Sequence, residues 1–237
     1  MNKGKLKEAL SVKQKKKVFY LLDDKKKIQT FKPWLGDMFS FLYDRIMSNS
    51  IFPKKFNGSI QKHFEILKNE FQHIHNKNTL EIATGSGNAV QFLNNDNLYT
   101  GTDISAGLLR IAVKRFNQNN FRNSEFYIAD ANDLPFIDNF FDLSFCHLSL
   151  NFFDSLENFI TELKRVLKPG GMFFCSVPVP EKKKPDVKIR GKLYSEIELK
   201  QLFSNFGFLY EKLPYENGAL LYFKAKLLEG NWINHSF

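Results

Sequence analysis

The feature that most constrains the fold of this chain is the stretch from Thr79 to Asn88, with the sequence TLEIATGSGN. Its first half is apolar and predicts a short buried strand, while its second half carries Gly85 and Gly87, where the backbone can turn sharply. A helix that begins after such a turn presents free N–H groups to a ligand. The stretch therefore predicts a strand over residues 79–84, a glycine turn open to a ligand, and a helix over residues 87–95.

An acidic residue follows this turn at the distance expected for a ribose-containing ligand. Residues 98–103 predict a second strand that ends in Asp103, about 20 positions past the turn, where a carboxylate can accept hydrogen bonds from ribose hydroxyls. Dinucleotides and S-adenosylmethionine both use this layout. The dinucleotide pattern requires Gly or Ala at the position of Val90, and it does not require an acid such as Glu81 before the turn. These two positions favour S-adenosylmethionine.

Four stretches, in order and at matching spacing, resemble the motifs of class I S-adenosylmethionine-dependent methyltransferases. They are residues 81–87 (EIATGSG), residues 102–105 (TDIS), residues 129–142 (ADANDLPFIDNFFD) and residues 163–171 (LKRVLKPGG). The resemblance covers residues 75–225, and the closest type acts on small molecules, lipids and quinones. It implies an α/β fold with a doubly wound, Rossmann-like, seven-stranded sheet and an N-terminal helical cap, and S-adenosylmethionine as the cofactor.

The resemblance also implies roles for individual residues. Glu81 would lie near the methionine amino group, Asp103 would hold the ribose hydroxyls, and Asp130 would accept a hydrogen bond from the adenine amino group. The complete set of implied cofactor contacts is Glu81, Ala83, Thr84, Gly85, Ser86, Gly87, Asp103, Ile104, Asp130, Ala131 and His147. The sequence departs from the family pattern at Ala83, where the first glycine usually lies. We expect Ala83 to fit there with a negative φ and to make the pocket slightly tighter.

Catalytic residues are harder to predict, because methyl transfer from a sulfonium depends mainly on positioning the acceptor and excluding water. A general base is needed only when the acceptor carries a proton of high pKa. His147, after the predicted fourth strand, is the candidate base, and the alternative is a purely structural histidine. Tyr43 is a second candidate. We expect the acceptor pocket between residues 147–153 and 34–43, with the proline-containing loop 178–192 as a candidate lid.

The pattern divides the chain into a basic arm (1–30), a cap of two amphipathic helices (31–75), the methyltransferase domain (76–226) and a tail (227–237). The cap histidines, His63, His73 and His75, are expected on the surface or on a helix face. In the domain, helices are expected over 105–118, 154–167 and 195–206, the last with a capping box of Ser195 and Glu198, and a hairpin over 207–226 closes the sheet.

The charge of the chain is concentrated in the arm. Ten lysines and three acids in residues 1–30 give +7 of the total +9, so the remaining residues are nearly neutral. We expect a solvated, partly helical arm whose apolar patch, residues 18–22, docks on the domain, and the alternative is contact with an anionic membrane surface or with RNA. The near-neutral domain favours a small-molecule, lipid or quinone-like acceptor. An RNA methyltransferase that holds phosphates with the arm is the alternative function.

The sequence shows no pattern typical of a metal site, a signal peptide or a membrane span. Cys146 and Cys175 fall in predicted buried strands and are expected to be inert, and no Cys/His spacing predicts a metal site. No signal peptide is evident, and no apolar run reaches the roughly 18 residues of a membrane span. We therefore expect a cytoplasmic protein without a metal, and the sequence does not predict its oligomeric state.

Overall fold

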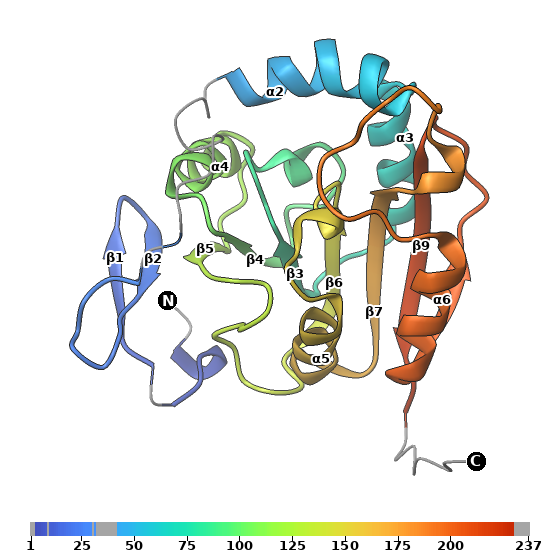
Figure 1. Ribbon diagram of the computed structural model, residues 1–237. Helices are drawn as coiled ribbons and strands as arrows, with labels where there is room; N and C mark the ends of the chain where they lie inside the picture. The colour runs from blue at the N-terminus through green and yellow to red at the C-terminus, as the bar shows by residue number, and fades with distance from the viewer. Residues whose placement is uncertain (1–2, 9, 30, 32–41, 230–237) are drawn as a thin grey trace.

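A nine-stranded sheet with the order β1-β2-β5-β4-β3-β6-β7-β9-β8 runs through the computed structural model, which describes residues 3–8, 10–29, 31 and 42–229 (Figure 1). The strands at its centre are parallel: β5 (Ser124–Ile128), β4 (Leu98–Asp103), β3 (Asn78–Ile82), β6 (Phe141–His147) and β7 (Leu167–Pro178). The antiparallel strands β9 (Leu220–Leu227) and β8 (Phe208–Lys212) close one edge. These seven strands confirm the predicted α/β fold class, but the predicted count of seven is too low, because two N-terminal strands extend the sheet.

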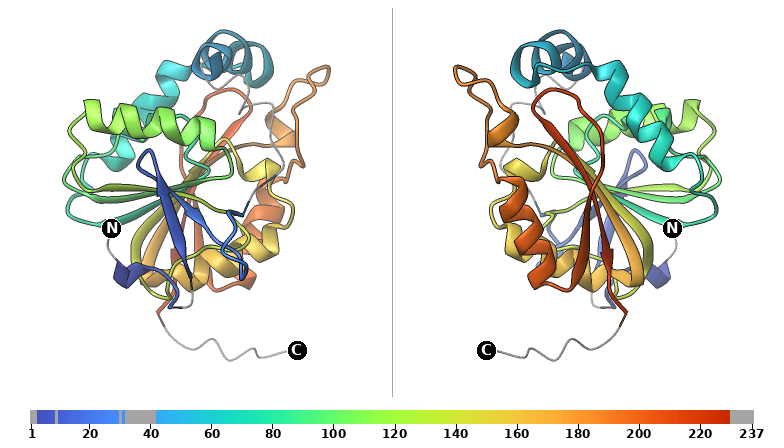
Figure 2. Two further views of the ribbon diagram at one scale, coloured as in Figure 1. Left: turned by 90° about the vertical axis from the view of Figure 1, so that its left-hand side faces the viewer. Right: turned by 90° about the vertical axis from the view of Figure 1, so that its right-hand side faces the viewer.

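Helices cover both faces of the sheet and give it two hydrophobic cores (Figures 1 and 2). One face packs against α3 (Ile60–Phe71) and α4 (Ala106–Gln118), and the other packs against α5 (Leu156–Val166) and α6 (Glu196–Asn205). Each of these helices begins after a serine whose hydroxyl accepts a backbone N–H, namely Ser59, Ser105, Ser155 and Ser195. The capping box predicted for Ser195 and Glu198 is confirmed.

The helix expected over residues 87–95 is wrong in extent, because only a short 3-10 turn, η4 (Asn88–Gln91), follows the glycine turn. Asparagine side chains after it tie the segment to the backbone that follows α3. The amide nitrogens of Asn94 and Asn97 donate to the carbonyl of Ile74, at 3.0 and 2.9 Å. The segment therefore continues as a loop into β4.

The apolar patch of the arm docks on the domain as expected, but the predicted partly helical conformation is wrong for the described residues. A short 3-10 turn, η1 (Lys3–Lys5), precedes a hairpin of β1 (Val12–Lys15) and β2 (Val18–Leu21), and β2 extends the sheet by pairing in parallel with β5. All four residues of β2 are buried, as its β-branched and aromatic composition favours. Lysines along the exposed edge strand β1 hinder pairing with another sheet, which is a structural reason for the charge of the arm.

The N-terminal cap lies across the carboxyl edge of the central strands (Figure 1). Its described part is α2 (Tyr43–Ile46), which continues as the π-helical segment η3 (Met47–Phe56), followed by α3. The predicted second cap helix, α3, is confirmed. Trp34 and most of the first predicted cap helix lie outside the described residues, as does the side chain of Tyr43.

Candidate functional site

Three residues of the glycine turn after β3, at every second position, have a left-handed backbone conformation. The φ angles are +58° at Ala83, +57° at Gly85 and +79° at Gly87. The expected negative φ at Ala83 is therefore wrong. The reason is tertiary, because the turn brings the N–H of Thr84 to the carbonyl of Thr102 on β4, at 2.8 Å. An L-residue with a Cβ is strained in this conformation by about 1–2 kcal/mol.

Replacing Ala83 with glycine should therefore stabilise the protein. We expect the free energy of unfolding to rise by about 0.5–1 kcal/mol, since the relief of strain exceeds the extra backbone entropy of glycine. Urea unfolding measures the change. Ala106→Gly, in the first turn of α4, is the matched control and should lower stability. A loss of stability in Ala83→Gly would show that the left-handed position carries no strain.

The ends of three neighbouring strands bring the predicted acids together. The carboxylate of Asp103, at the end of β4, accepts hydrogen bonds from the N–H of Gly85 and the N–H of Ser105, both at 2.8 Å. Asp130 follows β5 and accepts from the N–H of Asn132 at 2.8 Å. Ile104, beside Asp103, is 43% exposed although it is apolar. The carboxylates of Asp103 and Asp130 and the apolar side chain of Ile104 therefore lie at the same edge of the sheet. Ligands bind at this edge in doubly wound folds.

Glu81 is buried below the glycine turn and has an unusual proton affinity. Burial and the nearby charge of Asp103 raise the pKa of its carboxyl to about 8, although the hydroxyl of Tyr99 donates a hydrogen bond to it. A carboxyl with this pKa is largely protonated at neutral pH. A cationic group placed beside it would favour the ionised form. Tyr99, on β4, was not singled out from the sequence because only the strand pairing brings it next to Glu81.

A second group that sequence reasoning missed joins the cap to the glycine turn. Asp44 of α2 accepts hydrogen bonds from the hydroxyl of Ser86 at 2.6 Å and the amide of Asn88 at 3.2 Å, and it pairs with Arg115 of α4 at 2.5 Å. Burial acts to raise the pKa of Asp44, but hydrogen bonds from Arg115, Ser86 and Asn88 outweigh it and hold that pKa below its usual value. Nothing in the local sequence links these residues, which are far apart along the chain.

A cavity of about 60 Å³ lies beside the glycine turn and under the cap. Its walls combine Glu81 and the turn with apolar side chains of η3 and α3 and with His147 at the end of β6. His147 is half-buried, and its ring contacts the aromatic rings of Phe71, Phe92 and Phe145. His63 of α3 lines the same cavity and lies on the buried face of its helix, whereas His73 and His75 are exposed.

The loop over residues 178–192 packs beside the segment that follows His147. The amide nitrogen of Asn151 donates to the carbonyl of Arg190 at 2.6 Å, and the carbonyl of Asn151 accepts from the N–H of Lys192 at 2.8 Å. A Cβ on Gly191 would lie 2.0 Å from that same carbonyl. The loop therefore adjoins the expected acceptor side, and its role as a lid stays a prediction.

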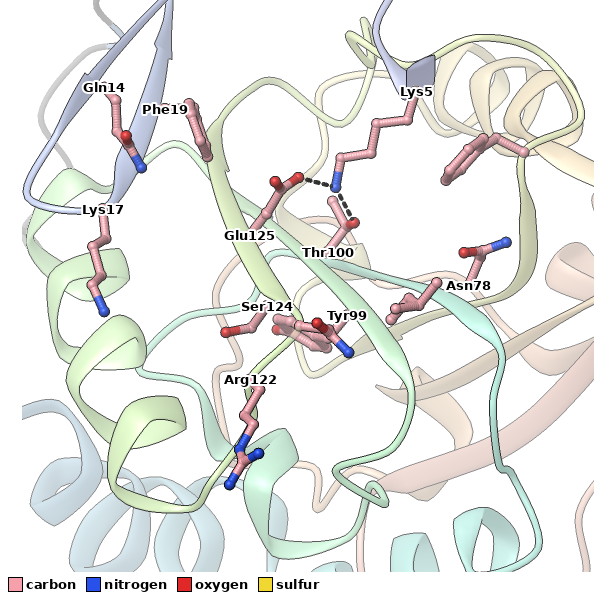
Figure 3. A pocket seen from close by; sticks show the side chains of 13 residues that line it. Lys5, Gln14, Lys17, Phe19, Asn78, Tyr99, Thr100, Arg122, Ser124 and Glu125 are labelled. Carbon is pink, nitrogen blue, oxygen red and sulfur yellow. Dashed lines mark hydrogen bonds and ion pairs between the residues drawn. The ribbon is translucent and has the colours of Figure 1, made fainter. Parts of the chain in front are cut away.

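A larger cavity of about 460 Å³ lies at the opposite, amino edge of the central strands (Figure 3). Lys5 reaches into it and pairs with Glu125 at 2.5 Å and with the hydroxyl of Thr100 at 2.8 Å. Burial acts to raise the pKa of Glu125, but Lys5 lowers it to about 2. No predicted site residue lines this cavity, so size alone does not identify the functional site.

Two further features concern metals and membranes. Cys146 and Cys175 face each other across β6 and β7, are both buried, and have thiol pKa values raised by burial. Among the described residues, no three His, Cys, Asp or Glu side chains cluster as metal ligands. None of the helices formed by those residues is both long and apolar enough to cross a membrane.

Comparison with known proteins adds independent findings. Residues 80–175 match the family model described as a methyltransferase domain. The chain is 36% identical over 109 residues to the ubiquinone/menaquinone biosynthesis C-methyltransferase UbiE of Rickettsia typhi, covering 42% of this chain and 44% of that protein. It is 32% identical over 119 residues to the demethylmenaquinone methyltransferase of Thermotoga maritima, covering 49% and 48%. The chain thus aligns with less than half the length of either relative.

Solved structures agree on the fold. An S-adenosylmethionine-dependent methyltransferase from Aquifex aeolicus superposes with a TM-score of 0.61 at 20% identity, covering 78% of this chain and 96% of that one. At this identity the similarity concerns the fold alone. Residues 80–175, which match the family model, and the residues that flank them form the central strands and the carboxyl-edge site described above.

Proposed function

We propose that this chain, whose residues 80–175 match a methyltransferase domain, transfers a methyl group from S-adenosylmethionine to a small, largely apolar, quinone-like acceptor. The observation that carries this proposal is the junction of Glu81, the glycine turn and Asp103 at adjacent strand ends. The quinone-like acceptor is inferred from the names of the two relatives, and the apolar walls of the cavity under the cap support it.

The residues present fit S-adenosylmethionine, which when bound supplies an electrophilic methyl group on a sulfonium. Asp103 is oriented by two backbone N–H groups, and its carboxylate would accept hydrogen bonds from the ribose hydroxyls. The raised pKa of Glu81 shows a buried carboxyl that a neighbouring cation, such as the methionine ammonium, would stabilise in its ionised form. Asp130 and Ala131 would bind the adenine, and the exposed side chain of Ile104 would lie against its ring.

The remaining parts of the site would position the acceptor and exclude water. Apolar side chains such as Phe52, Phe64 and Leu67 come from the cap, and His147 comes from the end of β6. We propose that His147 acts on the acceptor and does not hold the cofactor tightly, and we keep Tyr43 of α2 as a second candidate. In-line methyl transfer depends mainly on this alignment and on a dry cavity.

Calorimetric titration of the full chain tests the cofactor assignment. We expect S-adenosylmethionine to bind in the micromolar range, roughly −7 to −8 kcal/mol, and nicotinamide dinucleotides not to bind. Tighter binding of a dinucleotide than of S-adenosylmethionine would overturn the cofactor assignment.

Transfer of a labelled methyl group to a 2-prenyl-1,4-naphthohydroquinone, kept reduced, tests the acceptor class. Labelling of RNA without labelling of the hydroquinone would overturn the quinone-like acceptor.

The arm offers no specific support for the RNA alternative. Its lysines in β1 occupy an exposed sheet edge, where they have a structural role without a nucleic acid. Gel shifts with RNA and flotation with anionic vesicles at low salt test both contacts, since screening weakens either one.

A further inference from the structure

Two histidines from different layers of the fold face the same cavity beside the glycine turn. His63 belongs to the cap helix α3, and His147 ends the central strand β6. Their ring centroids are 5.9 Å apart with the rings almost perpendicular, and both rings line the cavity together with Glu81. A single polar group of a bound molecule can therefore reach both rings.

The orientation of His63 is determined by a short hydrogen-bond chain. Its Nδ1 lies 2.9 Å from the hydroxyl of Tyr222, and that hydroxyl accepts a hydrogen bond from the amide nitrogen of Asn217 at 3.0 Å. Because the Tyr222 oxygen already accepts from Asn217, its own proton is available to Nδ1, and the ring proton of neutral His63 is then on Nε2. Asn217 is itself held by two hydrogen bonds to the backbone of Ser59, where α3 begins.

His147 has the complementary arrangement. Its Nδ1 lies 3.0 Å from the hydroxyl of Ser176 on β7, and its Nε2 is buried without a hydrogen-bond partner among the described residues. When Nδ1 donates to Ser176, Nε2 carries a free lone pair. A buried polar atom without a partner costs roughly 1–3 kcal/mol, so a ligand that supplies the missing partner gains that free energy.

Both rings are neutral in this environment. Burial lowers the pKa of His63 to about 3, and burial together with His63 lowers the pKa of His147 well below its usual value. The other titratable groups that face the pair are Glu81, which lines the cavity, and Tyr222, which is bonded to His63. A neutral pair can offer one N–H donor and one lone pair at the same time, which a doubly protonated pair cannot.

We propose that His63 and His147 form a two-imidazole clamp for an acceptor that carries a hydroxyl group on an aromatic ring. The Nε2–H of His63 donates to the hydroxyl oxygen, and Nε2 of His147 accepts the hydrogen bond of that hydroxyl and takes its proton as the methyl group is transferred. This inference rests on the proposed function and adds His63, and the pairing of the two rings, to the acceptor side of the site. His63 and His147 are the catalytic residues of the clamp, and Tyr222, Asn217 and Ser176 are positioning residues.

The proton and electron balance of the step is simple. An electron pair of the acceptor, on oxygen or on a ring carbon, forms the bond to the methyl carbon while the hydroxyl proton moves to Nε2 of His147. The electron pair of the broken carbon–sulfur bond remains on sulfur, which becomes a neutral thioether. If a ring carbon is methylated, that carbon releases its proton to water, the C–H electron pair restores the aromatic ring, and the oxygen regains the proton from His147.

The tautomer of His63 in the unaltered protein is the first test. Long-range ¹H–¹⁵N spectra of the histidine-labelled full chain, saturated with S-adenosylhomocysteine, should show the Nε2–H form of His63. The Tyr222→Phe variant should contain a mixture of both tautomers, because the donor to Nδ1 is removed. An Nδ1–H form in the unaltered protein would overturn the proposal without any variant having to fold.

Binding of 1-naphthol, a small hydroxyarene, to the same complex is the second test. We expect its affinity to fall by about tenfold in His63→Gln and in His147→Gln, the scale of one lost hydrogen bond, while S-adenosylhomocysteine affinity is retained. His73→Gln, an exposed position just after α3, is the matched control and should bind as the unaltered protein does. No 1-naphthol binding, or equal affinity in all variants that unfold cooperatively, would overturn the clamp. Failure to bind S-adenosylhomocysteine at all would instead contradict the proposed function.

Discussion

Asp103→Ala is expected to weaken S-adenosylmethionine binding by about 1.5–3 kcal/mol, the scale of losing hydrogen bonds to a charged group. Two effects add. The ribose hydroxyls lose their acceptor, and the N–H groups of Gly85 and Ser105 lose the carboxylate that orients the glycine turn. In a calorimetric titration this corresponds to a dissociation constant roughly 10- to 150-fold higher.

A matched control separates this effect from a general loss of negative charge. Asp138→Ala removes an acid that is exposed and pairs with Arg165, away from the predicted site residues. We expect it to leave the dissociation constant unchanged. If Asp103→Ala binds S-adenosylmethionine as tightly as the unaltered protein, the assignment of Asp103 to the ribose is wrong.

Gly87→Ala is expected to lower the free energy of unfolding by about 3 kcal/mol, and the reason is packing as much as backbone strain. Gly87 has a φ of +79°, and a Cβ there would lie 2.7 Å from both Cα and Cβ of Ala112. It would also lie 3.2 Å from the ring of Phe116. The glycine turn and α4 are therefore in contact at a point where no side chain fits. Urea unfolding measures the loss.

A double-variant cycle with Ala112→Gly tests the packing part of this account. Removing the Ala112 Cβ opens space for the new methyl group, so the double variant should be less destabilised than the sum of the two single variants by about 1 kcal/mol. Strict additivity would mean that the contact between the turn and α4 contributes nothing to the loss.

The parts of the fold that depend on neighbouring residues could be predicted from the sequence. The strand before the glycine turn and the serines that begin the helices follow from hydrophobic pattern and local hydrogen bonding. The clustering of Glu81, Asp103 and Asp130 could be predicted because the carboxyl ends of parallel strands share one edge of a sheet.

Features that depend on contacts between distant segments could not be predicted in this way. Residues 18–21 have the composition of a strand, but their partner β5 lies more than 100 positions away, so the docking of this apolar patch could be expected and its pairing as a strand could not. The positive φ of Ala83 comes from the hydrogen bond between Thr84 and Thr102 on the next strand.

The residues around the acceptor side show the same division. His147 could be selected from the sequence because it follows a predicted strand at the ligand-binding edge. His63 could not, since its relevance depends on Tyr222, 159 positions later, and on the packing of α3 against β6 and β9. Asp44 likewise reaches Ser86 and Arg115 only because the cap lies across the glycine turn. The sequence by itself determined the central strands of the sheet, the glycine turn and the edge that carries the cofactor motifs, because local pattern encodes them. Only the tertiary structure decided which cap residues meet that edge, because those contacts join segments that share no local pattern.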